Sequence, residues 1–220
     1  MYECGRLYGG AILNSEKMQV HLPNIKIIDP QFLCTAYCNG YFPMADPKTG
    51  EINWYSPDPR TIFELDEFHI PRSLKLTLKK KEFEIRINEQ FENVMRACAE
   101  REDTWISETI IKSYVMLHQQ GLAHSVEAWK DGKLAGGLYG VSLQGAFFGE
   151  SMFSRSTNAS KVALVYLIDR LKEHNYTLLD TQFITEHLKR FGAREIPRDD
   201  YMKRLASALS ITCSFIKGKV

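Results

Sequence analysis

A strand, a helix and a second strand in succession between Phe148 and Gln182 constrain the fold of this chain more than any other feature. The segment FGESMF predicts a strand, residues 159–175 have the apolar periodicity of a helix, and YTLLDTQF predicts another strand. Strands joined by such a crossover are parallel and connected right-handedly, so we expect these two to lie side by side. Side chains two residues apart on a strand share a face, which places Asp180 and Gln182 together, close to Glu150. The pattern therefore predicts a polar site in a sheet.

Residues 61–220 predict one regular domain around that sheet. A three-strand meander precedes the crossover helix, and Asp131-Gly132 and Gln144-Gly145 mark its two hairpin turns. The elements expected before the crossover are strands at 61–65, 83–87, 124–130, 133–143 and 146–153, and helices at 71–81, 89–101 and 107–121.

The first sixty residues differ from the rest because they contain six of the eight prolines. They predict a compact, loop-rich unit around one helix within residues 29–40, with Asp29 as its N-cap and Gly40 at its end. We therefore expect an α+β protein in which a small proline-rich N-terminal domain, residues 1–60, precedes a catalytic domain, residues 61–220.

Composition excludes several classes of protein. Hydrophobic residues make up 44% and charged residues 25% of the chain, which is ordinary for a globular protein. No apolar run approaches the roughly eighteen residues of a membrane helix, and the N-terminus lacks the layout of a signal peptide, so we expect a cytoplasmic protein that does not bind membranes. The five cysteines are scattered and do not have zinc spacing, which indicates reduced thiols.

The order of a meander, a helix and a parallel strand is that of the acetyl-CoA-dependent N-acetyltransferase fold, so the predicted sheet is GNAT-like. That fold binds the pyrophosphate of coenzyme A with a glycine-rich turn before the crossover helix. Residues 155–160 read RSTNAS without a glycine, which argues against coenzyme A as the donor. The helix N-terminus, with Asn158 as its expected N-cap and Ser160 in its first turn, still suits an anion such as a nucleic-acid phosphate.

Several short segments occur in one characteristic order between Asp29 and about Leu205. They are GYFPM (40–44), WYSPDPR (54–60), TWI (104–106), GLAHSVEAW (121–129), GGLYG (136–140), FGESMFSR (148–155), NASK (158–161) and DTQ (180–182), followed by His187-Leu188 and Gly192-Ala193. In this joint order the chain resembles the bacterial leucyl/phenylalanyl-tRNA-protein transferases.

The resemblance implies an enzyme that moves leucine or phenylalanine, and methionine less readily, from aminoacyl-tRNA to a protein with an N-terminal Arg or Lys. The new peptide bond creates an N-end rule degradation signal, and neither a metal nor an organic cofactor takes part. The resemblance assigns Gln182 and Asp180 to the attacking amine and Glu150 to the α-ammonium of the donor. Because a carboxamide is a poor base, we expect Gln182 to orient the amine and Asp180 to take its proton.

The donor side chain needs an apolar slot. Candidates are Met152 on the strand of Glu150, Leu138 on the neighbouring strand, and the helical stripe of Leu164, Leu167 and Leu171. Many members of the family have methionine and phenylalanine where this chain has Leu138 and Leu167.

Contacts to tRNA are expected at two places. The resemblance places Trp54, Trp105 and Tyr114 near the 3′ end of the tRNA, where a stacked base gains roughly 1–3 kcal/mol. Asn158 and Ser160, at the start of the crossover helix, are expected at the same end of the tRNA. The dense basic cluster on the helix at 71–81 is a candidate for the tRNA backbone, and its residues are Arg72, Lys75, Lys79, Lys80 and Lys81.

Each assignment has a structural alternative. Asp180 and Gln182 could be a polar strand end that faces solvent, and Glu150 could be a buried acid satisfied by backbone amides. The leucine stripe and the aromatic residues could be plain core, and the basic cluster a solvated surface. For the whole protein the alternatives are an N-acetyltransferase, a related transferase with another donor or acceptor, and a non-catalytic RNA-binding module.

Overall fold

The computed structural model describes residues 17–18 and 27–216. The helices are α1 (Pro30–Cys38), α2 (Arg72–Lys80), α3 (Phe91–Ala99), α4 (Glu108–Gln119), α5 (Ala159–Glu173), α6 (Glu186–Lys189) and α7 (Arg198–Leu209), with a 3-10 turn, η1 (Leu65–Glu67). The strands are β1 (Lys17–Met18), β2 (Phe42–Ala45), β3 (Ile52–Tyr55), β4 (Arg60–Phe63), β5 (Glu84–Ile87), β6 (Ala123–Lys130), β7 (Lys133–Leu143), β8 (Ala146–Ser154), β9 (Leu178–Gln182) and β10 (Arg194–Ile196).

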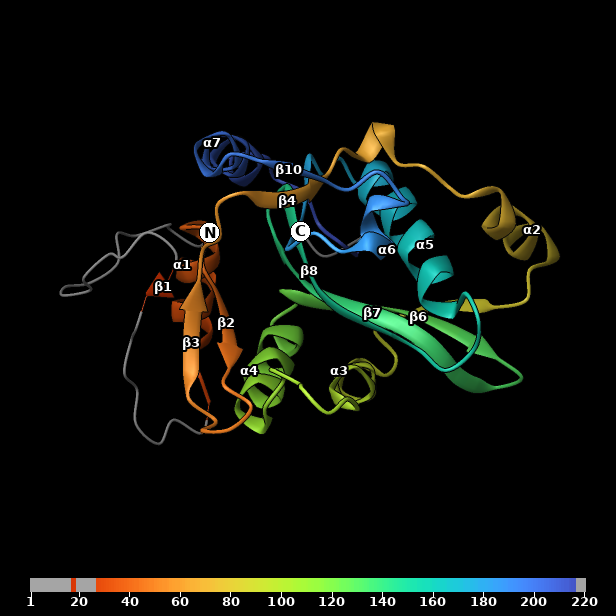
Figure 1. Cartoon of the computed structure of the whole chain (residues 1–220), viewed down its shortest axis with the longest axis horizontal. Coiled ribbons are helices and arrows are strands. Elements are labelled where there is room, and N and C mark those ends of the chain that lie inside the picture. The colour runs from red at the N-terminus through yellow and green to blue at the C-terminus, as the bar shows by residue number, and fades with distance from the viewer. Residues whose placement is uncertain (1–16, 19–26, 217–220) are drawn as a thin grey trace.

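Within these residues one seven-stranded mixed sheet has the order β10-β4-β9-β8-β7-β6-β5, and a small sheet has the order β1-β3-β2 (Figure 1). β8 and β9 pair in parallel, as expected for the crossover, and the other pairs are antiparallel. The prediction of a mixed α+β sheet flanked by helices is confirmed. Its finer relation to the N-acetyltransferase fold stays a prediction.

Local sequence accounts for the predicted elements. Asp131 and Gly132 have φ angles of 51° and 70°, the left-handed pair that a tight hairpin between β6 and β7 requires. The Asp29 side chain accepts a hydrogen bond from the Phe32 amide at 3.0 Å and caps α1, and Gly40 with φ 79° ends that segment. These three signals were correctly predicted.

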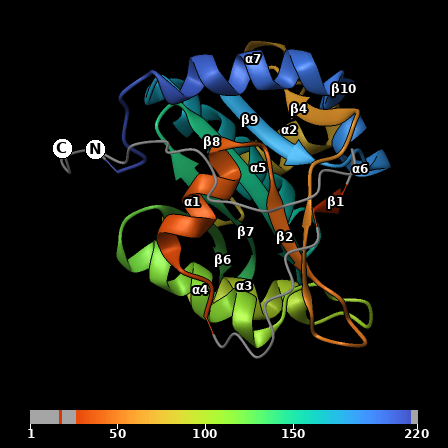
Figure 2. The same ribbon diagram turned by 90° about the vertical axis from the view of Figure 1, so that its left-hand side faces the viewer.

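The two faces of the large sheet carry separate hydrophobic clusters. α5 packs across β6, β7 and β8 on one face, with α2 beside it. α3 and α4 cover the other face, and α7 contacts β8, β9 and α1. A view at right angles shows α7 and the α3–α4 pair on opposite sides of the molecule (Figure 2). The longest helix, α5, has 15 residues, and no helix in the described part of the chain is long and apolar enough to cross a membrane.

The N-terminal region contains more regular structure than its prolines predicted. β2 and β3 form a hairpin beside α1, where the sequence indicated loops. β4, which begins at Arg60, enters the large sheet between β10 and β9. Tyr37 and Trp54 belong to the same hydrophobic cluster as Tyr139 and Phe148 of the large sheet. The division at residue 60 stays a prediction, and residues 1–16 and 19–26 of that unit lie outside the described residues. The helices and strand after residue 185 (α6, β10 and α7) were not predicted.

Candidate active site

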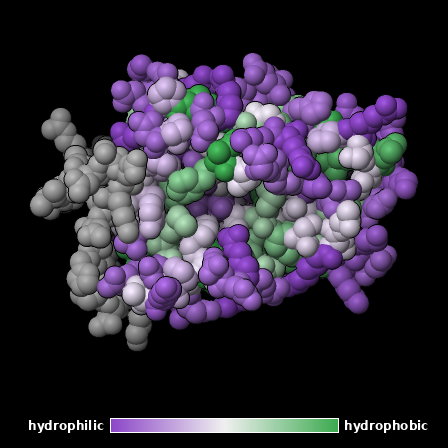
Figure 3. Space-filling view, viewed as in Figure 1, coloured by the Kyte–Doolittle hydropathy of each residue, from purple (hydrophilic) through white to green (hydrophobic). Residues whose placement is uncertain are grey.

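A pocket of about 260 Å³ opens where β8 and β9 separate. The two strands pair as far as Phe148 and Asp180. Beyond this point side chains from several elements line the pocket between them. On the face of the molecule shown in Figure 3, apolar side chains gather near the centre, between hydrophilic regions above and below. The lining residues are Phe42, Met44, Arg101, Trp105, Leu138, Tyr139, Gly149, Glu150, Ser151, Met152, Leu164, Leu167, Leu179, Thr181, Gln182, Phe183, Thr185, His187 and Leu188.

A β-bulge places Glu150 in this pocket. Tyr139 of β7 lies opposite Ser151 of β8, and the next pair is Gly140 with Gly149. Glu150 is therefore the extra residue of the bulge, and bulges redirect a side chain away from the regular alternation of the strand. The bulge explains how a carboxylate within an otherwise apolar strand comes to line the pocket.

Three side chains donate hydrogen bonds to Glu150. The Tyr37 hydroxyl lies 2.7 Å from Oε1, the Gln182 amide nitrogen lies 3.2 Å from the same oxygen, and the Tyr114 hydroxyl lies 3.4 Å from Oε2. Burial raises the pKa of Glu150 to about 8, against the lowering effect of the Tyr37 hydrogen bond, and the nearby charge of Asp180 adds to the increase. The carboxylate is thus held by side chains, not by the backbone amides that the structural alternative required.

Asp180 lies beneath the pocket, not in its lining. Its carboxylate is fully buried and accepts hydrogen bonds from Arg60 Nε at 2.9 Å, Arg60 Nη2 at 2.7 Å and the Tyr201 hydroxyl at 2.8 Å. Its Oδ1 also accepts from the Gln182 backbone amide at 2.9 Å. All of its strong acceptor positions are therefore occupied by the protein.

The prediction that Asp180 and Gln182 share one face stays a prediction, and the two side chains have different partners at the end of β9 (Leu178–Gln182). Gln182 has φ 59°, a left-handed conformation that interrupts the alternation of side chains. Its side chain consequently reaches the pocket and Glu150, while that of Asp180 points to Arg60 on β4.

Arg60 connects this site to the N-terminal unit. Its Nη1 donates to the Gly40 carbonyl at 3.0 Å, and its guanidinium carbon lies 4.7 Å from the ring centroids of both Phe42 and Tyr201. Burial alone would lower the pKa of Arg60, but the Asp180 carboxylate raises it above its ordinary value. Arg60 and Tyr201 were not predicted as site residues, and Arg60 is marked in the sequence by its place at the end of WYSPDPR.

Apolar residues form the opposite side of the pocket. Leu138, Met152, Leu164 and Leu167 line it, as the sequence predicted for the donor slot. Leu171 does not line it, because one further turn of α5 carries that side chain into the fully buried core. A residue that the prediction omitted, Leu179 of β9, takes part in the lining instead.

Two family models match the chain. The model described as leucyl/phenylalanyl-tRNA protein transferase N-terminal domain matches residues 27–58. The model described as leucyl/phenylalanyl-tRNA protein transferase matches residues 62–206. This chain belongs to that family.

Relatives agree with this assignment over nearly their whole length. Three proteins named leucyl/phenylalanyl-tRNA--protein transferase illustrate it. That of Gloeobacter violaceus is 52% identical over 188 residues, which cover 86% of this chain and 97% of that protein. That of Herpetosiphon aurantiacus is 53% identical over 191 residues, or 86% and 99% of the two chains. That of Salinibacter ruber is 51% identical over 185 residues, or 84% and 82%.

One solved structure, that of L-PGS from Bacillus licheniformis, aligns with a TM-score of 0.38 and 15% identity over 71% of this chain and 54% of that chain. This likeness is too distant to bear on function.

The three aromatic positions that the family resemblance indicated occupy different environments here. Trp105 lines the mouth of the pocket. Trp54 is fully buried and packs edge-on against Phe32 with 5.2 Å between ring centroids, so it is a core residue. Tyr114 is also fully buried and lies behind Glu150. The exposed aromatic side chain of Phe183, not predicted, lines the mouth as well.

The start of α5 lies beside α2, not at the pocket. Asn158 is the N-cap residue of α5, as predicted, but it has φ 70° and its side chain donates to Thr77 of α2 at 3.1 Å and makes no capping hydrogen bond. The buried Ser160 receives a substitute cap, because its amide donates to the Ser154 hydroxyl at 3.3 Å. Neither Asn158 nor Ser160 lines the pocket.

The predicted basic cluster is exposed. Four of its members lie on α2, and Lys81 is the left-handed residue that ends the helix. The members are Arg72, Lys75, Lys79, Lys80 and Lys81. Because Asn158 donates to Thr77, the start of α5 lies beside the helix that carries the cluster.

Proposed function

We propose that this protein is an aminoacyltransferase that moves leucine or phenylalanine from tRNA to proteins with an N-terminal Arg or Lys. The observation that carries the proposal is the composition of the pocket, in which an apolar slot and a buried carboxylate lie side by side. The aminoacyl group of Leu-tRNA or Phe-tRNA has two complementary features, an apolar side chain that fits the slot and an α-ammonium that pairs with the carboxylate. Family membership supports the donor and the reaction class.

The donor would bind with its side chain against Leu138, Leu164 and Leu167 and its α-ammonium at Glu150. The carboxylate is ready for this contact, since its hydrogen-bond donors hold it at the boundary between the apolar slot and Gln182. A buried charge without a partner is costly, so an ammonium that pairs with Glu150 is bound more tightly than one in a fully solvated site.

The reaction needs little acid–base power. The amine nitrogen of the acceptor attacks the ester carbonyl, a C–N bond forms, and the C–O bond to the 3′-terminal ribose breaks. An α-amine with an ordinary pKa of roughly 7.7–8.0 has a useful neutral fraction near pH 7. Alignment of amine and ester can contribute on the order of 7–11 kcal/mol, so a site made of positioning groups is sufficient.

Gln182 would act on the attacking amine directly, and Asp180 would act through Gln182. Gln182 faces the pocket, and its amide can orient the attacking amine. Asp180 holds the Gln182 backbone in its left-handed conformation, and its oxygens already accept from Arg60 and Tyr201. We therefore assign Asp180 to positioning, and the proton of the amine passes to the departing ribose oxygen or to water.

The tRNA would approach across the mouth. Trp105 and the exposed Phe183 offer aromatic faces to the terminal adenosine. The exposed basic residues of α2, together with the start of α5, would contact phosphates of the acceptor stem. We place this activity in the cytoplasm, where aminoacyl-tRNA is made.

A panel of donors and acceptors tests the proposal. Leu-, Phe-, Met- and Ala-tRNA, each with a radiolabelled amino acid, are mixed with peptides that begin with Arg, Lys, Asp or Glu, and the new amide bond is detected by mass spectrometry. We expect transfer of Leu and Phe to the Arg and Lys peptides. An acetyl-CoA arm tests the N-acetyltransferase alternative. Formation of no labelled peptide from any aminoacyl-tRNA would refute the proposal.

A further inference from the structure

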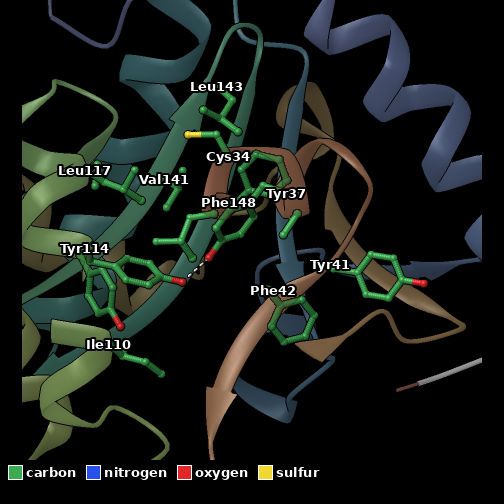
Figure 4. Packing of buried hydrophobic residues seen from close by; sticks show 14 of the residues in the cluster. Cys34, Tyr37, Tyr41, Phe42, Ile110, Tyr114, Leu117, Val141, Leu143 and Phe148 are labelled. Carbon is green, nitrogen blue, oxygen red and sulfur yellow. Dashed lines mark hydrogen bonds between the residues drawn. The ribbon is translucent and has the colours of Figure 1, made fainter. Parts of the chain in front are cut away.

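Tyr37 of α1 makes the shortest contact to Glu150, although 113 residues separate them. Its ring is fully buried and lies 4.8 Å from that of Phe148, which precedes the bulge of β8. Its hydroxyl also meets that of Tyr114 from α4, and Figure 4 shows the two hydroxyls turned toward each other. Three elements thus converge on one carboxylate.

The donors and acceptors of this group fix the direction of its hydrogen bonds. Each phenol carries one hydrogen, and an ionised carboxylate can only accept. Since the Tyr37 hydroxyl donates to Glu150 at 2.7 Å, the hydroxyl of Tyr114 must supply the hydrogen between the two phenols. The result is a chain from Tyr114 to Tyr37 to Glu150, and each link strengthens the next.

We propose that Tyr37 is a positioning residue for aminoacyl transfer, whose hydroxyl favours the ionised form of Glu150 and aims it at the α-ammonium of the donor. This inference rests on the proposed function. It makes α1 a part of the active site, because Tyr37 of the N-terminal unit supplies the hydrogen bond that Glu150 of the large sheet accepts.

Groups from several elements influence the charge of Glu150. Asp180 on β9 disfavours ionisation by its like charge, and Arg60 on β4 favours it. Tyr139 on β7, Tyr37 on α1 and Tyr114 on α4 are phenols whose pKa values burial raises well above the ordinary value, so all three stay protonated.

A phenol that stays protonated can stabilise the carboxylate as a donor but cannot take its proton. Tyr37 does so at 2.7 Å, whereas Tyr114, whose hydrogen points to Tyr37, lies 3.4 Å from Glu150. Removal of the Tyr37 hydroxyl should thus favour protonated Glu150 more than any other single hydroxyl change.

The test compares Tyr37→Phe with the unchanged enzyme between pH 6 and pH 9.5, with Leu-tRNA as donor and an Arg peptide as acceptor. A hydrogen bond to a charged group corresponds to about tenfold to hundredfold in affinity, so we expect KM for Leu-tRNA to rise by about tenfold at pH 7. The acid limb of kcat/KM should move to higher pH by about one unit, so the ratio between the two enzymes should narrow toward pH 9.5, where deprotonation of the donor α-ammonium slows both alike.

A donor without the α-amine separates positioning from structure. For tRNA acylated with 4-methylpentanoic acid, Tyr37→Phe and the unchanged enzyme should differ by less than about twofold, because no ammonium needs Glu150. Tyr41→Phe is the matched control: this tyrosine lies just after α1, and Figure 4 shows its hydroxyl turned away from the Tyr37–Tyr114 pair. It should behave as the unchanged enzyme with both donors.

An equal loss at every pH and with both donors would overturn the inference, and so would an unchanged acid limb. If Tyr37→Phe does not fold, Tyr114→Phe provides the second test, since it removes the first link of the chain and should shift the acid limb in the same direction by a smaller amount. No shift in that variant would also overturn the inference. Failure of the proposed function is distinguishable, because the unchanged enzyme would then form no product from Leu-tRNA.

Discussion

The two sides of the pocket are built in different ways. The apolar wall (Leu138, Met152, Leu164, Leu167 and Leu179) comes from β7, β8, α5 and β9, which follow one another in the chain. The polar wall consists of Glu150 and Gln182 together with the phenols behind Glu150, Tyr37 and Tyr114, so it draws on α1, α4, β8 and β9, from near the start of the described chain to the end of the crossover. Under the proposed function, recognition of the donor side chain would therefore be local, whereas the reacting end of the donor would meet groups that only the whole fold brings together.

This difference predicts different responses to substitution. The polar wall and the pair beneath it are connected by hydrogen bonds, so one change affects several partners. The apolar wall makes dispersion contacts that tolerate changes of volume at smaller cost.

The largest effect is expected beneath the polar wall. Arg60→Met leaves Asp180 buried without its cation, and the free energy of unfolding should fall by about 3–5 kcal/mol in urea denaturation. The double variant with Asp180→Asn, in which no charge is left unpaired, should recover a substantial part of this loss. A single variant that loses less than about 1 kcal/mol would show that the pair does not support the wall.

Glu150→Gln should reduce kcat/KM for Leu-tRNA by a factor that corresponds to about 2–5 kcal/mol, because it removes the charge that pairs with the α-ammonium. The same variant should leave the far-ultraviolet circular dichroism unchanged, since glutamine keeps the shape of the side chain. Full activity of the Glu150→Gln variant would contradict the role of the carboxylate in donor binding.

The stability of the same variant should depend on pH. Glu150 has a pKa of about 8 in the folded protein, above the unfolded value of about 4.3. Between these values the folded state holds the extra proton, so stability falls as pH rises through the window and the full penalty is present above about pH 8. Glu150→Gln removes the penalty, and it should be more stable than the unchanged protein at pH 9 and equally stable at pH 4. Urea denaturation of both proteins at pH 4 and at pH 9 measures this difference in stability.

A smaller change is expected at the apolar wall. Leu167→Phe fills part of the pocket and should disfavour the larger donor, so the ratio of kcat/KM for Leu over Phe should rise by an amount that corresponds to about 1–3 kcal/mol. Competition between the two charged tRNAs in one reaction gives this ratio directly. Leu171→Phe, in the core behind the pocket, serves as the comparison and should change stability without a change in the ratio.

The weakest effect belongs to the surface. Lys75→Ala with Lys79→Ala should lower the slope of log Kobs for tRNA against log salt by about 0.9 for each phosphate that is no longer neutralised, while the preference between donors stays the same. Lys203→Ala on α7, where the lysine pairs with Asp200, is the matched control. If that variant changes the slope equally, the cluster on α2 has no special contact with tRNA.

Local patterns predicted much of the fold and most of the apolar wall. Helical periodicity identified Leu164 and Leu167, and strand alternation with turn signals identified β6, β7 and β8. Helical periodicity does not show which residues of an apolar helix face reach a pocket and which lie in the core. For this reason Leu171 of α5 was assigned to the pocket, although it lies in the buried core.

The polar wall depends on features without a local signal. Tyr37 looks like any apolar position of an amphipathic helix, and only its tertiary neighbour makes it part of the site. The left-handed conformation of Asn158 leaves its side chain without the capping hydrogen bond that an N-cap usually makes, and that of Gln182 lies at the last residue of β9. The bulge at Glu150 likewise becomes visible only in the pairing of β7 with β8.

The position of β4 in the large sheet has a consequence for protein synthesis. β4 leaves the ribosome early, yet its sheet neighbours are β9 and β10, and Arg60 and Asp180 lie 120 residues apart. At a translation rate of roughly 5–20 residues per second, about 6–24 s pass between the synthesis of Arg60 and that of Asp180. A nascent or truncated chain without β9 therefore lacks both the pair and Gln182, and we expect the enzyme to modify no protein until β9 has been synthesised.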